Sequence, residues 1–71
     1  MGYPNLEATI YNKLTSDEWE LVSYYIKKAN GYSEQARDKE AREALEDAVA
    51  VAKANGEDNA ANKIAYYLRF Y

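Results

Sequence analysis

The chain contains neither cysteine nor histidine. Without these residue types it can form no disulfide, no cysteine- or histidine-based zinc site, no thiol nucleophile and no histidine general base. No stretch approaches the ~18 consecutive apolar residues of a membrane span, and the amino terminus lacks a basic-then-apolar signal pattern. We therefore expect a soluble chain with no membrane partner. The sequence does not specify a cellular location, although the lack of targeting segments favours the cytoplasm.

Large aliphatic residues are also scarce. Leu, Ile, Val and Phe together supply 12 of the 71 residues, a fraction typical of disordered chains. Disorder is favoured by high net charge, however, and the net charge here is only −3. Twelve Ala, eight Tyr and one Trp take the place of the missing aliphatic residues. We predict a folded domain whose core packs aromatic rings against alanine faces.

Glycine and proline are rare, and their positions divide the chain into long uninterrupted segments. Gly2 and Pro4 lie near the amino terminus, and the other two positions are Gly31 and Gly56. Both internal glycines end a Lys-Ala-Asn-Gly sequence and follow an apolar-periodic run. A left-handed glycine at such a position would close a helix, so we expect helices to end at both.

Capping residues mark the expected helix starts. Thr15 and Glu18 have the spacing of a capping box, Ser33 and Asp58 can cap two further helices, and Asn5 can cap a shorter first one. These signals predict an all-α fold with 1–71 as a single domain, a three-helix bundle in an αα-hairpin arrangement. The expected helices lie near 16–30, 33–55 and 58–70, with a short additional helix near 5–14.

Helical rotation of 100° per residue predicts which faces are buried. Segment 33–55 carries the widest apolar arc, so we expect it to be the central helix. Segment 16–30 should bury Trp19 and Val22 together with Ile26 and Ala29. The last segment should bury Ala60, Ala61, Ile64, Tyr67, Leu68 and Tyr71.

The helix–Gly–helix–Gly–helix layout and the stretch Ala44–Asp58 resemble a tetratricopeptide-type helical hairpin. Trp19 matches the first position of the family's Trp-x-x-Leu-Gly-x-x-Tyr signature, and Val22 approximates its Leu. Ser23 replaces the Gly, and Ile26 replaces the Tyr. Fewer than two repeats are present, whereas stacked arrays generally need three or more. The resemblance therefore implies only an αα-hairpin.

The densest acidic run, from Glu40 to Asp47, could suggest an acid–base or metal site because Glu43 and Asp47 share a helix face. Basic residues interleave with these acids, which is typical of a solvated helix surface. The chain has no histidine to complete a carboxylate di-metal site, and its Asn55–Asn59 turn lacks the ligand spacing of a calcium loop. We predict no enzyme activity, no cofactor, no metal and no evident small-molecule substrate.

Nucleic acid is also an unfavourable partner. Binding to a duplex strengthens with the number of phosphates that basic residues neutralise. The longest basic cluster, Arg37 to Arg42, is interrupted by Asp38 and Glu40. The sequence thus predicts no nucleic-acid binding.

Adjacent tyrosines at 24–25 and 66–67 are the most informative feature, because neighbours 100° apart on a helix cannot both face one core. One of each pair must be peripheral, unless residues 1–14 fold over the first pair. Exposed phenol rings supply large contact area at low entropic cost and are enriched at interfaces. The candidate partner-binding residues are Tyr66 and Phe70, with Tyr24 or Arg69 as flanks.

Three functions fit these observations. The first is a non-enzymatic helical module that binds a protein partner, or itself, through this aromatic face. The second is an idealised or designed helical-bundle scaffold with no binding task, favoured by the regular capping and dipole-ordered charges. The third is a small acidic inhibitor, immunity-type protein or nucleic-acid mimic that blocks a basic groove. Its contacts would be Asp17, Glu18, Glu20, Glu43 and Asp47.

Overall fold

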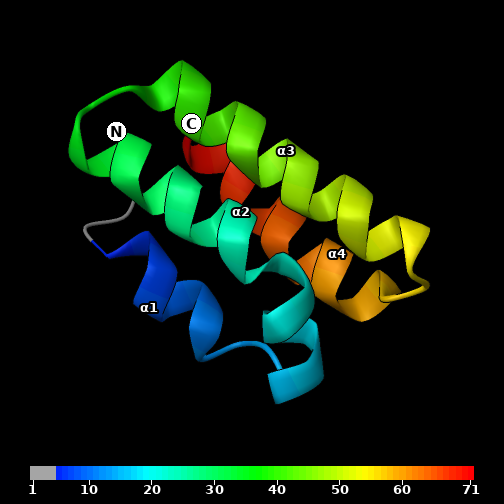
Figure 1. The fold of residues 1–71 in the computed structure, drawn as a ribbon. Helices are drawn as coiled ribbons and strands as arrows, with labels where there is room; N and C mark the ends of the chain where they lie inside the picture. Colours follow the sequence, from blue (N-terminus) through cyan, green and yellow to red (C-terminus); the bar gives the residue numbers. More distant parts are fainter. Residues whose placement is uncertain (1–4) are drawn as a thin grey trace.

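The computed structural model describes residues 5–71, and the predicted all-α class is confirmed (Figure 1). Over these residues the chain forms four α-helices and a short carboxyl-terminal 3-10 helix, with no strand. None of these helices is both long enough and apolar enough to cross a membrane. The elements are α1 (Leu6–Tyr11), α2 (Ser16–Glu34), α3 (Asp38–Ala54), α4 (Asp58–Tyr66) and the 3-10 helix η1 (Tyr67–Phe70).

The two long helices α2 and α3 lie side by side as an antiparallel hairpin (Figure 1). From the far end of α3 the chain turns back, so that α4 and η1 pack along α3, while α1 packs against α2. The central position that we expected of segment 33–55 alone is thus shared by α2 and α3. Helix α2 contacts α1 and α3, and α3 contacts α2, α4 and η1.

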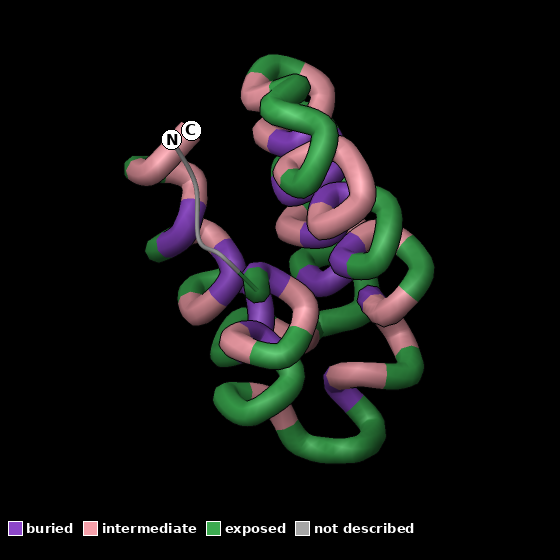
Figure 2. The backbone as a smooth tube through the Cα atoms, turned by 90° about the vertical axis from the view of Figure 1, so that its left-hand side faces the viewer, coloured by how far each residue is buried: buried purple, intermediate pink, exposed green. Residues whose placement is uncertain are grey.

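The core is built largely from alanine, with one larger aliphatic side chain or two from each α-helix. The buried parts of the helices lie on the sides that face the neighbouring helices (Figure 2). Of the aromatic side chains in residues 5–71, only Tyr67 is buried. Trp19, which we expected in the core, is half-buried and rests edge-on against Tyr11 with ring centroids 5.1 Å apart. The buried residues are Leu6, Ile10, Val22, Ile26, Ala29, Ala41, Ala44, Leu45, Ala48, Ala52, Ala60, Ala61, Ile64 and Tyr67.

The first two helices begin at the predicted caps. The Asn5 side chain accepts a hydrogen bond from the Ala8 amide at 3.1 Å. At α2 the capping box is complete, because the Thr15 hydroxyl accepts from the Glu18 amide at 3.3 Å and the Glu18 carboxylate accepts from the Thr15 amide at 2.9 Å. These bonds satisfy backbone donors that a helix start leaves unpaired.

The other two predicted caps are wrong. Ser33 lies inside α2, and Asp58 is the first residue of α4, preceded by Glu57 at a cap position that makes no side-chain hydrogen bond. Two predicted ends also differ. The first helix stops at Tyr11 instead of residue 14, and the regular α-helix of the last segment stops at Tyr66, with η1 completing it.

The two hairpin turns share one backbone arrangement, the Schellman motif. After α3 the Gly56 amide donates to Lys53 and the Glu57 amide donates to Ala52, while Gly56 adopts a left-handed φ of 75°. The turn after α2 repeats this pattern, with Ala36 in the left-handed position at a φ of 57°. Its amide donates to Ser33, and the Arg37 amide donates to Tyr32. Ala36, and not Gly31, is therefore the counterpart of Gly56.

Helix α2 continues through Gly31 for one further turn, which corrects the predicted end at residue 30 and moves the start of the next helix from 33 to 38. The added turn gains contacts that a helix ending at Gly31 would lack. The Ser33 hydroxyl and the Tyr71 hydroxyl share a hydrogen bond of 2.8 Å. The Arg37 guanidinium lies 5.1 Å from the centre of the Tyr32 ring. These contacts outweigh the weak helix propensity of one glycine.

Because the two turns share one geometry, exchanging glycine and alanine at their left-handed positions should change stability in opposite directions. Gly56→Ala should lower the free energy of unfolding by about 1–2 kcal/mol, because a Cβ is disfavoured in the left-handed region. Ala36→Gly should raise it by up to about 1 kcal/mol, since glycine removes that penalty but loses more chain entropy on folding. Urea unfolding followed by circular dichroism measures both. Changes of the same sign would contradict the shared turn geometry.

Gly31→Ala should stabilise the protein by about 0.5–1 kcal/mol, because alanine is the better helix former in a helix interior. A Cβ built at Gly31 meets nothing within 4 Å, so no steric cost offsets this gain. The same urea titration measures it. Destabilisation would instead indicate that the helix ends at Gly31, as the sequence alone predicts.

Candidate protein-binding site

The carboxyl-terminal segment is held against the hairpin by two hydrogen bonds. Arg42 of α3 donates from Nη1 to the Leu68 carbonyl at 2.6 Å, and Tyr71 meets Ser33 of α2. The Leu68 carbonyl also accepts from the Tyr71 amide at 3.2 Å, so the Arg42 guanidinium is a second donor, supplied by another helix. This anchoring sets the rotation of the last turn, in which Tyr67 is 4% exposed and Tyr66 is 50% exposed.

Three neighbours hold the Tyr66 ring. Its centroid lies 5.1 Å from that of Tyr67 and 5.7 Å from that of Phe70, both in edge-to-face geometry. The Arg69 guanidinium lies 5.1 Å from the ring centre. Such contacts contribute about 0.5–1.5 kcal/mol per aromatic pair and about 0.5–1 kcal/mol for an exposed cation–π contact. These contacts hold the ring against its neighbours. We call Tyr66, Phe70 and Arg69 the aromatic face.

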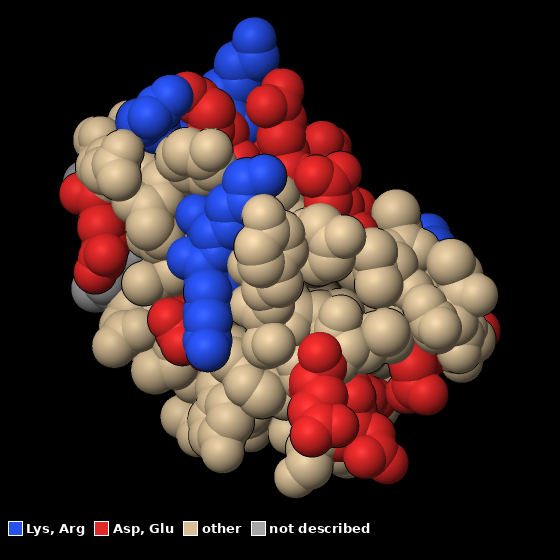
Figure 3. All heavy atoms as spheres, viewed as in Figure 1, with Lys and Arg blue, Asp and Glu red and all other residues tan. Residues whose placement is uncertain are grey.

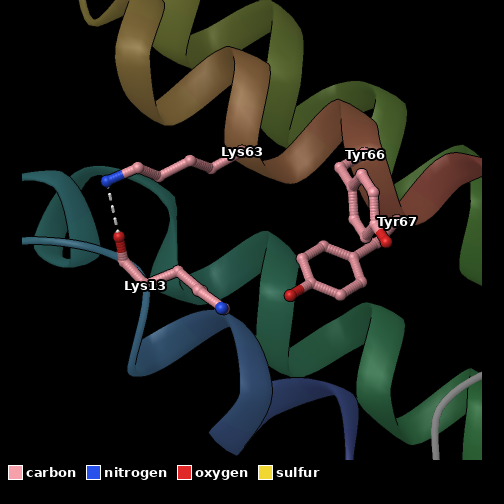
Figure 4. Close-up of a pocket in the computed structure, with 4 residues that line it drawn as sticks. All are labelled: Lys13, Lys63, Tyr66 and Tyr67. Carbon is pink, nitrogen blue, oxygen red and sulfur yellow. Dashed lines mark hydrogen bonds between the residues drawn. The ribbon is translucent and has the colours of Figure 1, made fainter.

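A pocket of about 410 Å³ adjoins this face, between α4 and the turn that follows α1. Figure 4 shows Lys13 and Lys63 on one side of it and the rings of Tyr66 and Tyr67 on the other. The Lys63 ammonium donates to the Lys13 carbonyl at 2.8 Å. This bond ties α4 to the turn and places the Lys63 ammonium beside Lys13.

The structure brings three of the four predicted residues together. Tyr66, Phe70 and Arg69 lie close together, but Phe70 is half-buried and packs against the core, whereas a partner-binding ring was expected to be exposed. Tyr67, the residue after Tyr66, is buried in the core, because a step of one residue turns a helix by 100°. The role of these residues in binding stays a prediction.

Tyr24 lies apart from the aromatic face. It is 67% exposed, stacks edge-on against Tyr25 at 5.2 Å and has the Lys28 ammonium 5.9 Å from its ring centre. On α2 it is rotated by about 200° from the buried Val22, so it points away from the core. The alternative in which residues 1–14 cover Tyr24 is wrong for the described residues 5–14, because Tyr24 stays 67% exposed although α1 packs against α2.

The sequence reasoning missed both lysines of the pocket and the contribution of Tyr67. The position of Lys63 was predictable in part. Residues three and four apart share a helix face, and Lys63 stands three positions before Tyr66 and four before Tyr67. Lys13 gave no such signal. It lies 50 residues from Lys63 along the chain, and only the packing of α1 brings the two together.

The acidic side chains form separate groups, one along the α3 edge and another at the opposite edge of the view in Figure 3. Glu18 is 5% exposed and occupied by the capping box, so it is unavailable to a partner. On α3 the Arg37 side chain pairs with Glu40 and the Arg42 side chain with Glu46. In residues 5–71, no group of three or more acidic side chains could hold a metal ion.

No protein-family model, curated protein sequence or solved structure matches the chain. The resemblance to tetratricopeptide-type hairpins thus rests on the residues quoted for it and stays a prediction.

Arg37 lowers the pKa of Glu40, first through the hydrogen bond of 2.9 Å between its Nε and the carboxylate, with a backbone hydrogen bond as the next cause. A carboxyl group whose pKa is lower in the folded state stabilises the fold above the unfolded pKa, and this contribution is lost as pH falls through the folded value. NMR titration should show Arg37→Gln raising the pKa of Glu40 more than Lys39→Gln does. Lys39 acts only through space. An equal rise in the two variants would contradict the role of the hydrogen bond.

Proposed function

We propose that this chain is a non-enzymatic helical module that binds a protein partner, or a second copy of itself, through its aromatic face. The observation that supports this most is the Tyr66 ring. Tyr66 is 50% exposed although Tyr67, Phe70 and Arg69 all contact its ring. Binding through a ring that its neighbours already hold costs little additional entropy, and tyrosine and arginine are enriched among the residues that dominate interface energies.

The pocket next to Tyr66 gives the aromatic face a hollow beside its exposed ring. A projecting ring beside a pocket lets a partner place one side chain over the ring and another into the hollow. Hot-spot residues typically lie in such packed surroundings, and neighbouring contacts exclude water from them. Phe70 packs against both Tyr66 and the core, so its contribution to binding cannot be separated from its contribution to stability.

The acidic-inhibitor alternative receives less support. Its contacts were expected to form one surface complementary to a basic groove. Glu18 is buried, and on the face seen in Figure 3 the acidic side chains lie in separate groups. The scaffold alternative makes a different prediction, namely a protein that remains monomeric and whose exposed tyrosines contribute to no complex.

Tyr66→Ala should weaken association by tenfold or more, roughly the loss expected of a hot-spot residue. The free energy of unfolding should fall by about 1–2 kcal/mol, because the edge-to-face and cation–π contacts of the ring are lost, which is less than the ~3–5 kcal/mol typical of truncating a buried aromatic side chain. Sedimentation velocity over a concentration series measures self-association, and affinity capture from a cell lysate measures binding to other proteins. Chemical denaturation measures stability.

Tyr24→Ala is the matched control, because it removes another exposed tyrosine ring, which lies on α2 apart from the aromatic face. It should leave association unchanged. A wild-type protein that stays monomeric and captures no partner would favour the scaffold alternative. If Tyr66→Ala instead lowered stability by several kcal/mol, the Tyr66 ring would be structural.

A further inference from the structure

The pocket beside Tyr66 concentrates positive charge in an acidic protein. Lys13 and Lys63 both border it, and within residues 5–71 no acidic residue lines it. The ion pairs within residues 5–71 involve Arg37 with Glu40 and Arg42 with Glu46, so neither lysine is neutralised there. The chain as a whole carries a net charge of −3. The pocket therefore has two ammonium groups without an ion pair in the described part of the chain, in a protein whose net charge is negative.

These ammonium groups retain hydrogen-bonding capacity. An ammonium group has three donors, and Lys63 uses one of them on the Lys13 carbonyl. Because this bond involves the backbone of Lys13, it leaves the Lys13 side chain unused. A carboxylate accepts through both oxygens, with about four lone-pair sites. A carboxylate in the pocket can therefore accept from the Lys13 ammonium or from the remaining donors of Lys63.

The opposite wall of the pocket is aromatic. The rings of Tyr66 and Tyr67 face the lysines across it (Figure 4), and Tyr66 continues outward into the exposed aromatic face. A ligand that fits must therefore combine one negative charge with adjacent apolar surface. A segment of protein in which a glutamate or aspartate adjoins large apolar side chains has this chemistry.

We infer that the pocket receives the carboxylate of an acidic partner segment, while an apolar side chain next to that carboxylate covers Tyr66. This inference rests on the proposed function and names the chemistry of the partner. A long polyanion is a poorer occupant, because the remainder of the surface carries excess negative charge and repels it. A single carboxylate flanked by apolar residues avoids most of that repulsion.

The test uses two matched peptides, acetyl-Leu-Glu-Leu-amide and acetyl-Leu-Gln-Leu-amide, titrated into the full isotope-labelled chain and followed by NMR. We expect amide signals near Lys63 and Tyr66 to shift, with a Kd about threefold to tenfold lower for the glutamate peptide, the range that one or two exposed ion pairs can supply. Salt at about 1 M, where the screening length is about 3 Å, should remove the difference. Equal Kd values at low salt, or no shift with either peptide, would overturn the inference.

Substitutions assign the charge effect to the pocket. Lys13→Gln and Lys63→Gln should each reduce the advantage of the glutamate peptide. Lys13→Gln does so without removing the hydrogen bond between Lys63 and the Lys13 backbone. Lys27→Gln removes an exposed lysine of α2 with the same change in net charge and should leave the advantage intact. An equal loss with Lys27→Gln would show that only overall charge matters.

Tyr66→Ala separates this inference from the proposed function. It should weaken both peptides alike, because the aromatic contact does not depend on the glutamate. If it weakened neither peptide while the lysine variants still removed the glutamate advantage, the proposed function of the aromatic face would fail and the charge preference of the pocket would stand.

Discussion

The close packing of the alanine faces of α3 and α4 against each other, and of α3 against α2, is the constraint on which the rest of this structure depends. A helix surface of alanine presents only methyl groups, so neighbouring helices approach closely and little volume remains to be filled. A few aliphatic side chains, among them Ile26, Leu45 and Ile64, fill it. This packing explains how a chain so poor in large aliphatic residues can still form a core.

The same packing decides where the aromatic side chains lie. A narrow core admits one ring from the described part of the chain, that of Tyr67, and the other rings surround it at the margin or on the surface. Tyr66 is consequently exposed and its neighbour buried. The bond from Arg42 to the Leu68 carbonyl and the bond between Ser33 and Tyr71 hold this last turn in place. The position of the proposed binding face thus follows from the core packing, and hydrogen bonds from both long helices hold it.

Local sequence signals were reliable where the interacting groups are close along the chain. The capping bonds of Asn5 and Thr15 and the left-handed conformation of Gly56 were predicted correctly because each depends on a few adjacent residues. Gly31 misled for a physical reason: glycine permits a left-handed turn but does not require one. The turn formed at Ala36, five residues later, where Tyr32 and Ser33 gain contacts with Arg37 and Tyr71. Those contacts include a residue nearly 40 positions distant.

The sequence by itself determined the all-α class, the hairpin arrangement, most buried positions and the exposure of Tyr66, because helical periodicity and capping depend on residues a few positions apart. The tertiary structure alone decided that Tyr24 stands apart from Tyr66, that Phe70 is half-buried and that Lys13 meets Lys63. Each of these outcomes depends on the rotation and approach of whole helices. Their positions are set by the sum of many small packing contacts, and no short segment of the chain encodes that sum.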